Sequence, residues 1–195
     1  MDRVRVGIAL YNAGRYLAAH EPLEALWLEA PAGERDDCLQ GLIQASAAVY
    51  KSRRGNDKGA AGLAESAPEY LTDCAVVDVD ALRAWLERLA ADPGVGRGQE
   101  PPELRLDGEA LGIYDLSPAA VVAAAEAVAA AEDDDLLERA GDYAARDVAE
   151  GETTSPFVTL TMDYINDPTP VVRQRLEEHV DRRRTRASDV EGLFE

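Results

Sequence analysis

The sequence predicts an all-α protein, a helical bundle of about eight or nine helices in which an N-terminal bundle is followed by a C-terminal helical extension. Apolar residues recur at spacings of three and four along most of the chain, as they do on the buried face of a helix. Hydrophobic residues make up 46% of the chain, which is enough for a core, but aromatic residues make up only 6%. Much of the apolar content is alanine, the best helix former, and strand signals are weak.

Five helices are expected in the first half of the chain, where apolar stretches alternate with residues that end helices. The first carries Val4, Ile8 and Tyr11, and a turn at Gly14 ends it. Pro22 must lie in the first turns of the second helix or bend it, because proline has no amide hydrogen to donate. The next helices are expected at about residues 15–30, 34–53 and 56–71, and a fifth helix is expected to start at Asp78 or Asp80 and to include Leu89.

A stretch rich in glycine and proline, DPGVGRGQEPPE, follows these helices and has the composition of a linker. We therefore expect a helical bundle over residues 1–92, a linker over 93–106 and a C-terminal helical region over 107–195. Helix starts in this last region are indicated by a capping residue followed by proline. These pairs are Ser117-Pro118, Ser155-Pro156 and Thr169-Pro170, although β-branched residues after the second pair leave a strand possible there.

The charge of the chain argues against two classes of partner. Asp and Glu number 38 against 20 Lys and Arg, a formal net charge of −18. Nucleic acid and anionic membranes both require a positive surface, so we expect neither as a partner. Lys51 and Lys58 are the only lysines. This acidic, lysine-poor and alanine-rich composition resembles that of halophilic, haloarchaeal proteins, whose self-repulsion is screened by salt.

Cys38 and Cys74 are far apart in the sequence and form no CxxC pair. We therefore expect neither a disulfide framework nor a zinc ribbon. The first residues lack the long apolar region of a signal peptide, and no apolar stretch is long enough to span a bilayer. The expected location is the cytoplasm.

Several candidate catalytic or metal-binding residues lie on one face of the second helix. Tyr16, His20, Glu24 and Trp27 follow one another at four- and three-residue steps, so they share a face of the second helix. His20 and Glu24 can place a nitrogen and a carboxylate on one divalent metal ion, or act together in proton transfer. In that interpretation Glu21 is a further catalytic candidate, and Gln40 and Gln44 of the third helix assist.

A structural interpretation of the same face is favoured. A histidine held by Glu24 and bonded to Gln40 or Gln44 would fix the register of the second and third helices. Tyr16 and Trp27 are then core aromatics. Asn12 and Asn56 are typical of a turn and of a helix start, with contact to a ligand as the less favoured interpretation.

Three separated blocks of the first half resemble the domain of unknown function family 309. They are LYNAGRYLAAHEPLEALW, LQGLIQASAAVY and GNDKGAAGL, and their order and spacing match the pattern of that family. The resemblance covers about a third of the chain and implies a compact helical bundle. It implies no activity. One departure is Lys51, which stands at a position that is often histidine in the family.

The function predicted first is that of a non-catalytic protein-interaction or structural module, a homo-oligomer or one bound to a protein partner, with no cofactor. The alternative is a small-molecule or metal-dependent enzyme centred on His20 and Glu24. An arginine cluster over residues 173–186 indicates either docking to nucleic acid or to an acidic partner, or pairing with nearby carboxylates, and the pairing is favoured. Leu193 and Phe194 in the final DVEGLFE segment are expected to act as a short apolar anchor.

Overall fold

A computed structural model describes residues 2–75 and 77–191 of the chain, and for 187–191 only the helical backbone. The chain divides into two compact units, Met1–Asp115 and Leu116–Glu195. Within the described residues there are ten α-helices and one small three-stranded sheet, so the all-α prediction is confirmed. Among these helices none is both long enough and apolar enough to cross a membrane.

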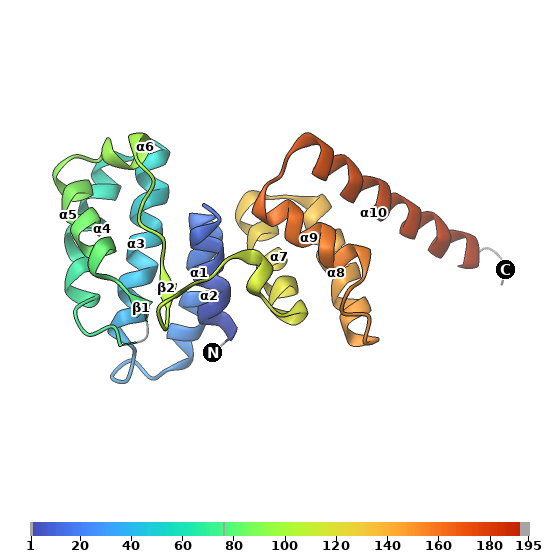
Figure 1. Cartoon of the computed structure of the whole chain (residues 1–195), viewed down its shortest axis with the longest axis horizontal. Coiled ribbons are helices and arrows are strands. Elements are labelled where there is room, and N and C mark those ends of the chain that lie inside the picture. The colour runs from blue at the N-terminus through green and yellow to red at the C-terminus, as the bar shows by residue number, and fades with distance from the viewer. Residues whose placement is uncertain (1, 76, 192–195) are drawn as a thin grey trace. The chain divides into compact units, whose positions relative to one another are not determined.

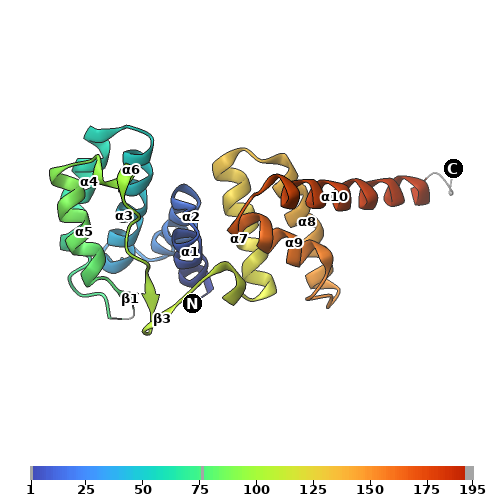
Figure 2. The same ribbon diagram turned by 45° about the horizontal axis from the view of Figure 1, so that its top comes forward.

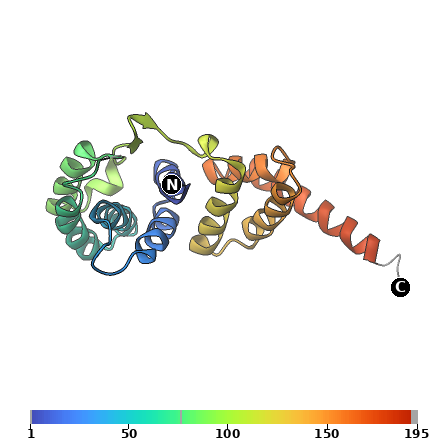
Figure 3. The same cartoon turned by 90° about the horizontal axis from the view of Figure 1, so that it is seen from below.

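Six helices build the first unit, and the first five pack in sequence order, each against the next. Figures 1 and 3 show them side by side. Their bounds are α1 (Asp2–Asn12), α2 (Tyr16–Glu29), α3 (Asp37–Arg53), α4 (Asp57–Tyr70), α5 (Asp80–Ala91) and the short α6 (Val95–Gly98).

Capping and turn residues set these boundaries close to their predicted places. The Asn56 side chain accepts a hydrogen bond from the Gly59 amide at 3.0 Å and so caps α4, as expected. Asp36 caps α3 in the same way, through the Leu39 amide. Gly14, with φ of +76°, adopts the left-handed conformation that ends α1, because glycine has no Cβ to oppose it.

A small antiparallel sheet in the first unit was not predicted. Its strands are β1 (Val77–Asp78), β2 (Arg105–Leu106) and β3 (Glu109–Ala110), and they lie in that order. Asp107 and Gly108 join β2 to β3, and both have positive φ, 52° and 82°. This is the geometry of a two-residue hairpin turn, for which an Asp-Gly pair is a strong signal.

The residues predicted to be a linker, 93–106, lie within the first unit. They supply α6 and β2, and the leucines that follow the glycine- and proline-rich stretch are buried. Leu104, Leu106 and Leu111 all lie in the core. The stretch over residues 92–103 that was predicted to be a linker contains the short helix α6, and the unit continues past the buried leucines to the 3-10 turn at Ile113–Asp115.

The expectation of no disulfide is wrong. Cys38 in the first turn of α3 is bonded to Cys74, which follows α4, and their Cα atoms are 5.1 Å apart. The two cysteines are 36 residues apart in the sequence, and the antiparallel packing of α3 and α4 brings them together. Spacing along the sequence could not reveal this, because the hairpin of two helices decides it.

In the second unit, residues 116–191 are described, and they form four helices: α7 (Pro118–Glu132), α8 (Asp135–Ala149), α9 (Pro156–Asn166) and α10 (Pro170–Glu191). Ser117 and Ser155 cap α7 and α9 through side-chain hydrogen bonds, so the predicted serine–proline starts are confirmed. The segment after Ser155 is a helix, and the strand alternative is wrong. In Figures 1 and 2, α10 continues past the other helices of this unit.

The start of α8 is tied to α9 and α10. The Tyr164 hydroxyl donates a hydrogen bond to Asp134 at 2.6 Å, and Arg173 lies 3.3 Å from the same carboxylate. Asp134 also accepts from the amides of Leu136 and Leu137. The expected anchor residues Leu193 and Phe194 lie outside the described residues.

Candidate functional site

The outer face of α2, formed by Leu17, His20, Glu21, Glu24 and Leu28, is the candidate site. The helix arises from the apolar spacing noted above, and its inner face buries small and branched side chains against α1 and α3. Leu23 is one of these, and it packs on Gly7 so closely that a Cβ there would lie 2.5 Å from the Leu23 Cγ. The close approach of α1 to the inner side leaves the polar residues of α2 facing outward.

His20 and Glu24 are brought together, as their spacing predicted. The His20 Nε2 atom lies 3.7 Å from a carboxylate oxygen of Glu24. Their side chains are 32% and 45% exposed, so the pair lies at the surface. It is therefore neither sealed in the core nor enclosed in a cavity, and the four cavities described for the structure are lined by residues of other segments.

The other aromatic candidates of α2 have partners that the sequence did not indicate. The Arg35 guanidinium lies 4.0 Å from the centre of the half-buried Trp27 ring. Tyr16 is buried and packs edge-on against Tyr11, with 5.2 Å between ring centres. Arg53 covers the Tyr16 ring at 4.8 Å.

The Tyr16 hydroxyl donates a hydrogen bond to Glu100 at 3.4 Å, and Glu100 in turn pairs with Arg53. Burial raises the pKa of Tyr16 to about 12, with Arg53 opposing the rise and Glu100 adding to it. Burial also raises the pKa of Tyr11. The Tyr16 hydroxyl is therefore a protonated donor to Glu100 at neutral pH, whereas the Tyr11 hydroxyl is buried and has no hydrogen-bond partner in the described part of the chain. The contacts of Arg53 with Tyr16 and of Tyr16 with Tyr11 join α3 to α2 and α1.

The two glutamines do not join the His20–Glu24 pair in the way that was expected. The Gln44 side chain accepts a hydrogen bond from the Ser66 hydroxyl at 2.7 Å, so it connects α3 to α4. Gln40 is half-buried on α3. Glu21 is exposed. Gln44 is thus directed toward Ser66 of α4 and not toward the His20–Glu24 pair.

Asn12 has a structural role. Its amide nitrogen donates to the carbonyl oxygens of Leu104 and Leu111, each at 2.9 Å, and its oxygen accepts from the Leu104 amide at 2.8 Å. These three bonds fasten the end of α1 to the residues around the hairpin. The side chain thereby satisfies backbone groups of a buried segment that has little regular structure.

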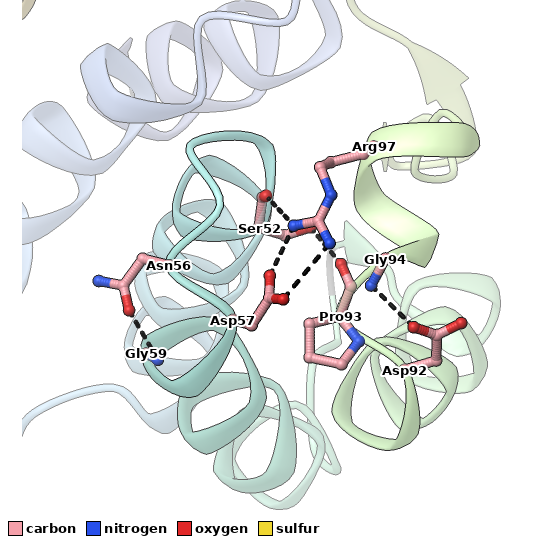
Figure 4. A network of polar contacts seen from close by, with 8 residues as sticks. All are labelled: Ser52, Asn56, Asp57, Gly59, Asp92, Pro93, Gly94 and Arg97. Atoms are coloured by element: carbon pink, nitrogen blue, oxygen red, sulfur yellow. Dashed lines mark hydrogen bonds and ion pairs between the residues drawn. The ribbon is translucent and has the colours of Figure 1, made fainter.

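Asn56 belongs to a polar network where α3, α4 and α6 meet (Figure 4). Arg97 donates to the Ser52 carbonyl at 2.9 Å and pairs with Asp57 at 2.5 Å. The hydrogen bond from Arg97 lowers the pKa of Asp57. The Ser52 hydroxyl donates to the Pro93 carbonyl, which brings the start of α6 against α3. This network explains why the stretch after Asp92 is ordered.

His20 and Glu24 are also the predicted candidate ligands for a metal ion. Over residues 2–75 and 77–191 no group of three or more His, Cys, Asp or Glu side chains is arranged to hold a metal ion. The pair therefore supplies two candidate ligands, and the described residues supply no third ligand beside them.

The comparisons with known proteins agree with the resemblance in the first half. The family model of the Domain of unknown function (DUF309) matches residues 4–63, which run from α1 into α4. An uncharacterised protein of Aquifex aeolicus (strain VF5) is 29% identical over 99 residues. That match covers 49% of this chain and 29% of the relative's own length. No solved structure matches the chain.

Two residues of the candidate site were missed by sequence reasoning. Leu17 and Leu28 are 36% and 54% exposed, although both are large apolar residues within the apolar pattern of α2. Their positions on the outer face could have been found from the sequence, because both lie on the same helical line as Glu21 and Glu24. They were not distinguished from the core residues because α2 is rich in apolar residues.

Proposed function

We propose that the chain is a non-catalytic interaction module that pairs with a second copy of itself through the outer face of α2. The observation that carries this proposal is the exposure of Leu17 and Leu28 on one helix face. Exposed leucines are ordinary one at a time, but two on one line of a helix form an apolar strip suited to contact.

The spacing of the two leucines suits an antiparallel pair of α2 helices related by a two-fold axis. Eleven residues separate them, which is close to three helical turns. With the axis midway between them, Leu17 lies against the partner's Leu28, and Leu28 against the partner's Leu17. A two-fold interface of this kind uses the same face of both copies, so one strip is sufficient.

The charges between the leucines make this pairing depend on salt. Glu21 and Glu24 lie in the middle of the strip, so two copies bring four carboxylates together, with a His20 beside each pair. The chain as a whole is also acidic, with a net charge of −18. Near 1 M salt the screening length falls to about 3 Å, which removes most of this repulsion. The proposed dimer therefore forms in the high-salt conditions that the haloarchaeal-type composition suggests.

The interaction module is better supported than the enzyme centred on His20 and Glu24. This pair lies on an open surface and not in a cavity, and it supplies two candidate metal ligands with no third beside them among the described residues. The cytoplasmic location stays a prediction, and the Cys38–Cys74 disulfide removes one of its premises.

The test is the molar mass of the full chain by light scattering at 0.1 M and 2 M KCl, over about 10 to 500 μM protein. Contact through a single helix face buries little area, so weak association is expected. The expected result is a monomer at low salt and an increasing dimer fraction at high salt. Leu28→Asp should abolish the dimer, and Glu21→Gln should allow it at lower salt.

Val171→Asp is the matched control, because Val171 is 60% exposed on α10 and lies away from α2 in the sequence. It should leave the dimer unchanged. A chain that remains monomeric throughout, or that loses its dimer equally in both aspartate variants, would show that the α2 face is not the interface.

A further inference from the structure

A cavity of about 300 Å³ lies in the second unit between α10 and the start of α9, and cationic side chains surround it. Arg182, Arg183 and Arg186 line it from α10, together with His179. Pro156 and Phe157 line it from α9. No part of this cavity belongs to the α2 face, so its role is independent of the proposed pairing.

The spacing of residues on α10 puts these groups on one side. His179, Arg182 and Arg186 follow one another at three- and four-residue steps, and Arg175 precedes them by one turn. They form a line of cationic and imidazole groups along the helix. A convergent set of guanidinium groups is the usual means by which proteins bind phosphate, since each presents several donors in a fixed plane.

Two of the arginines are already held in place. Arg183 is bonded to Asp147 at 2.6 Å and lies over the Tyr143 and Phe157 rings, at 5.3 and 5.4 Å. The Asp147 side chain is only 2% exposed, so its charge is matched by Arg183. Arg182 donates to the Glu178 carbonyl at 3.0 Å and lies 2.9 Å from the His179 Nδ1 atom. Groups fixed in advance lose little freedom when they bind a ligand.

The charge balance of the cavity is positive in an otherwise acidic protein. Three guanidinium groups line it against two carboxylates, Asp147 and Glu152, and Arg183 matches the first of these. This leaves the two guanidinium groups of Arg182 and Arg186 and the single carboxylate of Glu152 among the lining residues. The apolar side of the cavity is Phe157, whose ring meets the His179 ring edge-on with 6.4 Å between centres. An anion with an attached aromatic or apolar group would contact both sides.

We infer that this cavity binds a phosphorylated small molecule, with Arg182 and Arg186 contacting the phosphate and Phe157 contacting the organic group. The negative charge of Glu152 would repel the phosphate. The inference can therefore be tested by removing a positive charge from the cavity and, separately, by removing this negative charge. Removing an arginine should weaken binding, and removing the Glu152 charge should strengthen it.

The experiment is calorimetric titration of the full chain with inorganic phosphate and with phenyl phosphate, at constant ionic strength with chloride as the reference anion. We expect phenyl phosphate to bind more tightly than inorganic phosphate, because only the ester reaches Phe157. Arg182→Gln and Arg186→Gln should each weaken binding about tenfold or more. Glu152→Gln should tighten it severalfold.

Arg184→Gln is the matched control, since it removes the same charge from the same helix. Arg184 does not line the cavity, and its side chain pairs with Asp181. It should change affinity less than twofold. Thermal unfolding of each variant checks that the second unit is folded. Absence of phosphate binding by the unmodified chain, or equal weakening by Arg184→Gln and Arg186→Gln, would overturn the inference. Equal affinity for both phosphates would overturn the role of Phe157.

Discussion

Replacing Asn12 with alanine should destabilise the first unit by about 2–4 kcal/mol. The side chain makes three hydrogen bonds, two to carbonyl oxygens and one from an amide, all with buried leucines. A hydrogen bond contributes about 0.5–1.5 kcal/mol net, and a buried group left without a partner costs more. Asn12→Asp should be at least as damaging, because it loses both donors and places a carboxylate beside two carbonyl oxygens.

Urea unfolding followed by circular dichroism measures this loss, with Asn166→Ala as the control. Asn166 is exposed at the end of α9, so its replacement should change the free energy of unfolding by less than about 0.5 kcal/mol. Hydrogen exchange provides a local readout, since the Leu104 amide should exchange faster in Asn12→Ala than in the unmodified chain. A loss below about 0.5 kcal/mol in Asn12→Ala, or full stability in Asn12→Asp, would refute the reasoning.

Two further predictions concern the disulfide and an aspartate. Replacing both Cys38 and Cys74 with alanine should lower the free energy of unfolding by about 2–4 kcal/mol, which is the usual contribution of a disulfide that closes a loop of this size. Adding a reductant to the unmodified chain should reproduce the loss. If a reductant has no effect on the free energy of unfolding, the prediction is wrong. Burial acts to raise the pKa of Asp134, but hydrogen bonds from Tyr164 and two amides, with Arg173 nearby, lower it overall. The charge of Asp134 therefore stabilises the folded state above the unfolded pKa of about 3.9, and this contribution is lost as the pH falls through the lower folded value. The stability advantage over Asp134→Asn, measured by urea unfolding, should be constant from pH 5 to 7 and shrink below about pH 4; an advantage independent of pH would contradict this.

Helix ends were the most predictable part of the fold. Asn56, Ser117 and Ser155 cap helices through contacts with residues only three positions away, so a single sequence carries the whole interaction. The Asp107-Gly108 pair also carries a local signal, for a hairpin, but the proline- and glycine-rich residues before it favoured a linker. The buried leucines on either side of that pair contradict a free linker.

The candidate site was less predictable, because its partners are distant in the sequence. The contact between His20 and Glu24 follows from one helical turn and was expected. Tyr16 depends on Glu100, which is 84 residues away, and Asn12 depends on Leu104 and Leu111. The Cys38–Cys74 bond is of the same kind. Such contacts arise from the packing of whole helices, so no spacing rule indicates them.

The covalent link between the start of α3 and the segment after α4 has a consequence for proteolysis. Arg53, the last residue of α3, and Arg54, in the turn that follows, are exposed, and a trypsin-like protease can cleave after either. A cut there falls inside the loop that the disulfide closes, so both fragments stay attached and keep their helix pairing. The nicked protein would have nearly the mass of the intact chain until it is reduced, and electrophoresis without reductant would not detect the damage.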